Sequence, residues 1–75
     1  MIINAAKLAR LRFIDSMMDY YGRMNREHLA DFFGIPVPQA SKDLGDYQTE
    51  YPVNIVYNLS AKRYERSATY RRALP

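Results

Sequence analysis

The sequence predicts a mainly α-helical domain with a small β-hairpin near its C-terminal end. Apolar residues recur at helical spacing along the first two thirds of the chain, glycine and proline interrupt them, and β-branched and aromatic residues gather later. At 75 residues, the chain has room for one small core. Since 48% of its residues are hydrophobic, it has enough apolar surface to fold.

Composition narrows the class of protein. The chain contains no cysteine, so a disulfide framework and thiolate metal sites are ruled out. We find no stretch long enough to span a membrane, and the start of the chain is unlike a secretory signal. We therefore expect a cytoplasmic protein without a membrane partner.

The first helix is expected from about Ala5 to Tyr21. Four residues at spacings of three and four form its predicted buried face: Leu11, Ile14, Met18 and Tyr21. The opposite face is expected in solvent and carries Arg12, Asp15, Ser16 and Asp19. Gly22 then supplies the left-handed residue that commonly ends a helix.

The second helix is expected from about Arg26 to Phe33. Asn25 is a suitable N-cap, and Glu27 lies in the first turn, where the helix dipole favours a carboxylate. Met24 is placed to pack on Leu29 across this cap. Gly34 is expected to end the helix as Gly22 ends the first.

The stretch FFGIPVPQASKDL predicts a sharp corner followed by a new helix. Proline cannot continue the second helix but is tolerated in the first turn of the third, where its missing N–H costs nothing. The third helix should bury one face and stop at Pro52. The residues of that face are Ala40, Leu44, Tyr47 and Tyr51.

Two helices joined by a short glycine-containing turn form a helix-turn-helix, whose second helix reads DNA in the major groove. The candidate DNA-reading residues lie on or beside the exposed face of the third helix: Pro38, Gln39, Ser41, Lys42 and Gly45. A glutamine there can pair with adenine. Three carboxylates form a separate stripe, expected to pair with arginines of the domain or lie in solvent: Asp43, Asp46 and Glu50.

The segments VNIVYN and KRYERS predict the two strands of the hairpin. A helix-turn-helix followed by a hairpin is a winged helix, with Lys62 and Arg63 at or just after the tip of the wing. Residues 53–75 carry five basic side chains and one acidic side chain, so the positive charge gathers there. Arg26 is a third candidate phosphate contact.

Four blocks carry a family resemblance: RLRFID, GRMNREHLADFFGI, QASKDLGDY and NIVYNLSAKRY. Together they resemble the N-terminal winged helix-turn-helix domain of bacterial WYL-domain transcriptional regulators, in particular the BREX regulator and CapW type associated with phage defence. The resemblance implies a homodimeric repressor that binds double-stranded DNA at an inverted repeat. It also implies that Gln39, Ser41 and Lys42 lie on the recognition helix.

Such regulators continue into a ligand-sensing domain and a dimerisation domain. We expect residues 1–66 to form the winged helix-turn-helix and residues 67–75 to be a C-terminal tail or the start of a linker to an effector domain that is absent here. The chain is then either an excised DNA-binding domain or a natural short form. In both cases we expect no small-molecule site in it.

An apolar stripe on the first helix suggests a second kind of surface. Phe13, Met17 and Tyr20 widen this stripe beyond what one small core requires, so they are candidates for a dimer or domain interface, helped by Ile2 and Ile3. If this surface carries the function, the alternative is a winged-helix module for protein–protein interaction.

An enzyme is not expected. Asp15 and Asp19 are four residues apart, but no nucleophile, general base or phosphate-binding glycine loop accompanies them. His28 is the single histidine, so it is predicted to be a surface or capping residue and not a metal ligand. We expect no catalytic residues, no cofactor and no metal.

Overall fold

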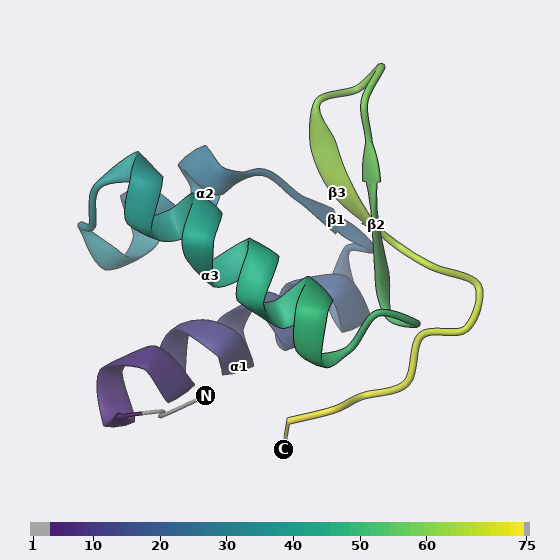
Figure 1. The fold of residues 1–75 in the computed structure, drawn as a ribbon, viewed down its shortest axis with the longest axis horizontal. Coiled ribbons are helices and arrows are strands. Elements are labelled where there is room, and N and C mark those ends of the chain that lie inside the picture. The colour runs from purple at the N-terminus through teal and green to yellow at the C-terminus, as the bar shows by residue number, and fades with distance from the viewer. Residues whose placement is uncertain (1–3, 75) are drawn as a thin grey trace.

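A computed structural model describes residues 4–74, which form three helices and a three-stranded sheet. In chain order the elements are α1 (Ala5–Tyr20), β1 (Arg23–Met24), α2 (Arg26–Phe33), α3 (Val37–Glu50), β2 (Ile55–Asn58) and β3 (Arg63–Arg66). The helices pack together, and the β2–β3 hairpin projects away from them (Figure 1). The predicted class, three helices followed by a small hairpin, is confirmed.

The helix boundaries follow from local signals. The Asn25 side chain accepts a hydrogen bond from the His28 backbone N–H at 2.9 Å, as predicted for the N-cap of α2. Gly34 ends α2 in the left-handed conformation, with φ 65°. Pro36 then precedes α3, and Pro38 is accommodated in its first turn. This geometry produces the corner between α2 and α3.

Replacing Gly34 by alanine should lower the free energy of unfolding by about 1 kcal/mol, because an L side chain disfavours the left-handed backbone. No atom lies within 4 Å of the added Cβ, so a clash would not contribute. Gly45, in the interior of α3, is the matched control. The Cβ added in Gly45→Ala also meets open space. This variant should raise the free energy of unfolding by about 0.5–1 kcal/mol, because alanine is more favourable than glycine inside a helix. Urea unfolding of the two variants checks this; the same sign for both would contradict it.

The sheet has the order β1-β3-β2, with both pairs antiparallel. Tyr64 of β3 lies opposite Met24 on one side and Tyr57 on the other. The sequence predicted the hairpin but not β1, which at two residues is too short to show an alternating pattern. β1 therefore attaches the hairpin to the segment that follows α1.

The core combines residues from every helix and from the sheet. Its members are Leu11, Ile14, Met18, Met24, Leu29, Ala30, Ala40, Leu44, Tyr47 and Ile55. Tyr21, predicted to share the buried face of α1, is 65% exposed, so that prediction is wrong. α1 ends at Tyr20 and the chain turns at Tyr21, which removes Tyr21 from the helical periodicity.

The prediction that Asp15 lies in solvent is also wrong, because its side chain is completely buried. The Asp15 carboxylate accepts hydrogen bonds from the Tyr47 hydroxyl and from the backbone N–H groups of Ala73 and Leu74. The C-terminal segment, residues 67–74, covers this side of α1 although it contains no helix or strand. Tyr70 of the same segment packs against the core and donates to the Asp15 backbone oxygen.

A buried ionic cluster joins α1 to α3. The Lys7 ammonium lies 2.6 Å from a carboxylate oxygen of Asp43 and 2.6 Å from one of Asp46, and Arg10 also binds Asp43. Burial alone would raise the pKa of Asp43, but hydrogen bonds from Arg10, Lys7 and Gln39 outweigh it and lower that pKa. The expected pairing with an arginine is thus observed for Asp43, which binds Arg10, whereas Asp46 pairs with two lysines, Lys7 and Lys42.

This cluster predicts a loss of stability in acid. The pKa of Asp46 is lowered mainly by the hydrogen bonds from Lys7 and Lys42. A carboxyl group with a lowered pKa stabilises the fold above its ordinary pKa, 3.8, and loses that contribution as the pH falls through its folded value. The free energy of unfolding should therefore fall below about pH 4. In Asp46→Asn the fall should be shallower, and equal slopes in acid unfolding titrations would contradict this assignment.

Candidate nucleic-acid interface

The exposed face of α3 carries most of the predicted DNA-reading residues. Pro38 and Lys42 are exposed, and Ser41 and Gly45 are partly exposed. All four lie away from the buried side of α3, which packs against the core through Ala40, Leu44 and Tyr47. Because no added Cβ at Gly45 would meet an atom within 4 Å, the helix surface there is open.

Gln39 borders the stripe of carboxylates on α3. Its amide nitrogen donates to Asp43 at 3.0 Å, so Gln39 belongs to the ionic cluster in this structure. Lys42 also binds a carboxylate of the stripe, Asp46, at 2.9 Å, but 67% of the Lys42 side chain is exposed. The lysine therefore remains accessible at the edge of the face, whereas the glutamine is engaged.

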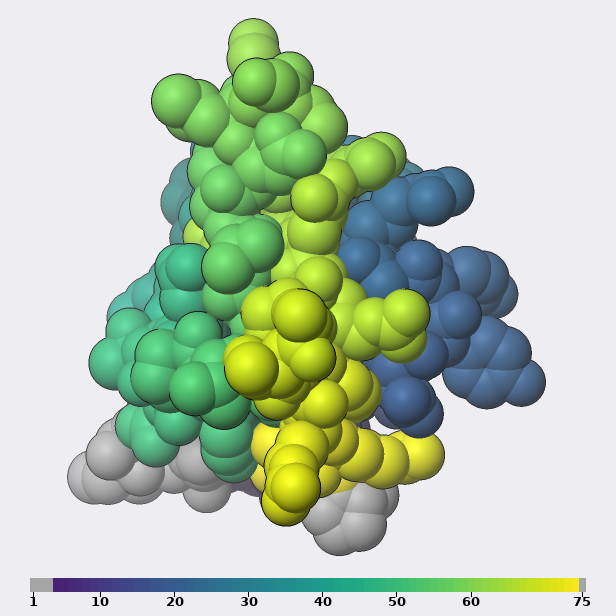
Figure 2. Space-filling model, turned by 90° about the vertical axis from the view of Figure 1, so that its right-hand side faces the viewer, coloured from purple at the N-terminus to yellow at the C-terminus, as the bar shows by residue number. Residues whose placement is uncertain are grey.

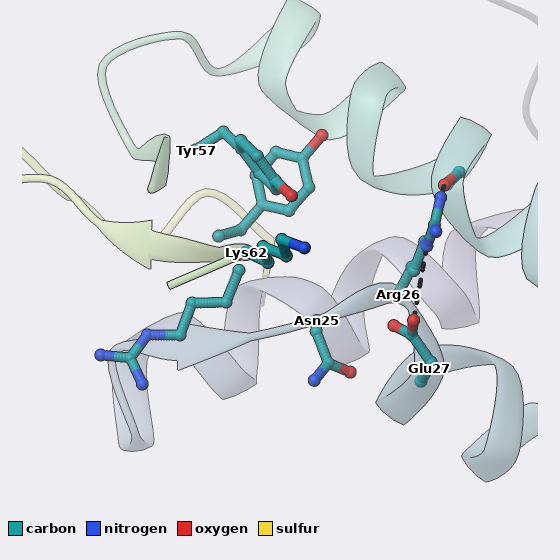
Figure 3. A pocket seen from close by; sticks show the side chains of 8 residues that line it. Asn25, Arg26, Glu27, Tyr57 and Lys62 are labelled. Atoms are coloured by element: carbon teal, nitrogen blue, oxygen red, sulfur yellow. Dashed lines mark hydrogen bonds and ion pairs between the residues drawn. The ribbon is translucent and has the colours of Figure 1, made fainter. Parts of the chain in front are cut away.

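A pocket of about 320 Å³ opens beside this face, between the start of α2, α3 and the hairpin (Figure 3). It is lined by Asn25, Arg26, Glu27, Ser41, Tyr57, Lys62, Arg63 and Tyr64. The three predicted phosphate contacts meet in this pocket, although Arg26 lies far from Lys62 and Arg63 in the sequence. They bring three positive charges against the single carboxylate of Glu27.

Arg26 connects the pocket to α3. Its guanidinium donates to the Ser41 hydroxyl at 3.4 Å and lies 3.5 Å from the Glu27 carboxylate, while 57% of its side chain stays exposed (Figure 3). These contacts are long and solvent-exposed, so they hold Arg26 weakly. The guanidinium is available to an anion that enters from solvent.

The turn of the hairpin presents Lys62. Its backbone has φ 55°, and the Asn58 side chain accepts a hydrogen bond from the Ala61 N–H across the same turn. Within residues 4–74, Lys62 forms no ion pair. Arg63 differs, because it binds Glu65 at 2.7 Å; the pKa of Glu65 is lowered by this hydrogen bond and by one from Asn58.

Sequence reasoning missed several residues of this site. Asn25, Glu27, Tyr57 and Tyr64 line the pocket without having been assigned to it. The alternation of the hairpin places Tyr57 and Tyr64 on one face, where they form a cross-strand pair with ring centroids 4.9 Å apart. That alternation was available from the sequence, but the position of α2 relative to the hairpin was not.

The candidate interface on α1 is divided between the interior and solvent. Phe13 stacks on Phe32 with ring centroids 4.2 Å apart, and Met17 packs against the core. Tyr20 is 84% exposed. Ile2 and Ile3 lie outside the described residues.

No metal centre is found in the described part of the chain, where no group of three or more His, Asp or Glu side chains is suitably placed. His28 is exposed in the first turn of α2. None of the described helices is long and apolar enough to cross a membrane.

A helix-turn-helix of α2 and α3, supported by α1 and followed by a projecting hairpin, defines a winged helix-turn-helix domain. The chain belongs to the family described as the BrxR transcriptional regulator winged helix-turn-helix domain, whose family model matches residues 6–74.

The chain is also similar to curated relatives that are named as DNA-binding transcriptional repressors. The chain is 44% identical over 62 residues to the DNA-binding transcriptional repressor CapW of Escherichia coli strain KTE188, an alignment that covers 83% of this chain and 21% of the relative. It is 39% identical over 66 residues to CapW of Pseudomonas aeruginosa, covering 88% and 22%. For CapW of Stenotrophomonas maltophilia the identity is 49% over 55 residues, covering 73% and 18%. The chain thus spans about a fifth of the length of these relatives.

Proposed function

We propose that this chain binds double-stranded DNA as the sequence-reading domain of a transcriptional repressor. The observation that carries the proposal is the open face of α3 beside a pocket with three basic side chains. A helix in the major groove reads base edges, while basic side chains on both sides bind phosphates and fix its position. The relatives named as DNA-binding transcriptional repressors support the same function. This function would place the protein in the cytoplasm.

Base reading is assigned to the face of α3. Ser41 and Lys42 present hydrogen-bonding groups to the groove, and Pro38 and Gly45 allow a close approach of the helix because they are small or flat. For Gln39 to read adenine, its amide must first leave Asp43. We therefore expect Gln39→Ala to alter base preference less than Ser41→Ala does.

Phosphate binding is assigned to Arg26 and Lys62, with Arg63 as a third contact that must compete with Glu65. Each phosphate neutralised by a basic side chain releases counterions, so the logarithm of the affinity falls with the logarithm of the salt concentration. Arg26→Ala and Lys62→Ala should each reduce this slope by about 0.9.

Titration of a labelled duplex at several salt concentrations measures these slopes. Arg12→Ala is the matched control, because Arg12 is an exposed arginine on α1, outside the pocket. It should leave the slope unchanged. An equal reduction for all three variants would show that only net charge matters, and it would overturn the phosphate assignment.

We further propose that the protein binds an inverted repeat as a homodimer, because two linked half-sites give a helix-turn-helix its specific affinity. The surface of Phe13, Met17 and Tyr20 is the candidate contact between the copies, with Tyr20 the most exposed of the three. Sedimentation with and without the operator tests this. Tyr20→Ala should weaken the dimer and leave half-site affinity unchanged.

A protein-interaction module is the second candidate, favoured by the exposed aromatic residues Tyr20, Tyr21 and Phe32. If this were the function, substitutions on α3 would leave partner binding intact. Substitutions of these aromatic residues would abolish it.

A further inference from the structure

The projecting hairpin is attached to the helices on two sides. On one side, β1 pairs with β3, and the guanidinium of Arg66 at the end of β3 donates to the backbone oxygen of Asp19 at the end of α1. On the other side, the short connection 51–54 leads from α3 into β2. The position of the hairpin relative to α3 therefore depends on how that connection is held.

Asn54 is the buried residue that holds this connection, while the hydroxyls of Ser67 and Thr69 donate to the Val53 backbone oxygen on its exposed side. It is 2% exposed, and its side-chain amide donates both to the Tyr47 hydroxyl, at 3.1 Å, and to the Arg71 backbone oxygen, at 2.8 Å. Its side-chain oxygen accepts from the Arg71 N–H at 3.0 Å. One buried amide thus joins α3, the start of the hairpin and the C-terminal segment.

The same network continues to α1. The Tyr47 hydroxyl donates to Asp15, whose carboxylate also accepts from the backbone N–H groups of Ala73 and Leu74. Burial and the hydrogen bond to Asp15 raise the pKa of Tyr47, so its hydroxyl stays protonated and remains a donor. Among the described residues, no buried side-chain nitrogen or oxygen lacks a partner. Figure 2 shows the C-terminal segment, in yellow, lying against the molecule below the hairpin.

We infer that Asn54 is a positioning residue for DNA binding: with Tyr47 and the C-terminal segment, it fixes the hairpin so that Lys62 and α3 engage one duplex together. This inference rests on the proposed function. It makes residues 70–74 part of the DNA-binding machinery, because a fully bonded polar network of this kind selects one arrangement. A hairpin released from it would keep its strand pairing but lose its fixed angle to α3.

The first test needs no DNA. The chain has no cysteine, so Ser60→Cys in the turn of the hairpin and Glu50→Cys in α3 introduce a unique pair of spin-label sites. In this double-cysteine protein, pulsed electron paramagnetic resonance should give one narrow distribution of distances between the two spin labels. Asn54→Ala, and Tyr47→Phe as a milder variant that keeps the ring in the core, should broaden or shift it. Ile14→Val, which removes one buried methyl group of α1 outside the network, should not.

The second test measures DNA affinity for a duplex that the unmodified chain binds, in variants that circular dichroism shows to be folded at the assay temperature. Lys62→Ala should weaken binding by about threefold or more in the unmodified and Ile14→Val backgrounds, and by less than about twofold in the Asn54→Ala or Tyr47→Phe background. Equal losses in all backgrounds, or an unchanged distance distribution, would overturn the inference. Failure of the unmodified chain to bind any duplex would instead refute the proposed function, while the distance measurement would still report on the network.

Discussion

Asp43→Ala is expected to lower the free energy of unfolding by about 3–5 kcal/mol, because it removes the buried carboxylate shared by a buried lysine, Lys7, and a partly buried arginine, Arg10. Lys7 and Arg10 both bind the Asp43 carboxylate, and the side chain of Lys7 is only 9% exposed. Domains of this size have a net stability of about 4–11 kcal/mol. The variant should therefore be partly unfolded at physiological temperature, which thermal and urea unfolding would measure.

The matched control for this prediction is Asp31→Ala on α2. Asp31 is exposed and forms no ion pair within the described part of the chain. Its loss should change the free energy by no more than about 0.5 kcal/mol. If Asp43→Ala cost as little as the control, the ionic cluster would not be a determinant of how α3 packs on α1.

Lys42→Glu is expected to produce the largest loss of DNA binding from a single substitution, about 100-fold. The change removes a donor at the edge of the α3 face and places a carboxylate against the negative groove and phosphates. The new carboxylate would also face Asp46 one turn away, at a small cost in stability of about 0.5 kcal/mol. Fluorescence anisotropy with an operator duplex measures the affinity.

Arg12→Glu is the matched control, because Arg12 is exposed on α1 and its reversal changes the net charge by the same amount as Lys42→Glu. It should weaken binding by no more than about threefold, through the long-range field alone. If the two charge reversals weakened binding equally, α3 would not be the DNA-reading element. The effect would then follow from net charge.

The sequence predicted those parts of the fold that depend on local signals. The boundaries of α2 follow from the Asn25 cap and the left-handed Gly34. The corner before α3 follows from two prolines, and the hairpin from alternating aromatic and β-branched residues. Each of these features is determined by a few adjacent residues, so a single sequence is sufficient to find it.

Contacts between distant residues were not predictable in the same way. Asp15 looked like a solvent residue because the groups that bury it, Ala73 and Leu74, follow it by 58 and 59 positions. Gln39 lies close to the base-reading positions in the sequence, yet its amide is held by Asp43.

Arg66 contributes to the positive charge of the C-terminal third, but no sequence pattern indicates that its guanidinium donates to the backbone oxygen of Asp19 at the end of α1.

In the candidate site, too, the sequence predicted what local periodicity determines and not what tertiary packing determines. Helical periodicity alone is sufficient to place Ser41, Lys42 and Gly45 on or beside one face of α3. The pocket that joins Arg26 to Lys62 is a property of tertiary packing, because it needs α2 and the hairpin on the same side of α3. No periodic pattern in the sequence predicts that α2 and the hairpin lie on the same side of α3.

Selection of bound duplexes from a random pool tests whether α3 reads a DNA sequence. The chain would be attached to beads at high density, so that two copies can bind one duplex, and the enriched sequences would be read at low and at moderate salt. We expect one enriched motif, arranged as an inverted repeat, that the Lys42→Glu variant fails to enrich. Absence of any motif at both salt concentrations, or the same motif with Lys42→Glu, would contradict sequence reading by α3.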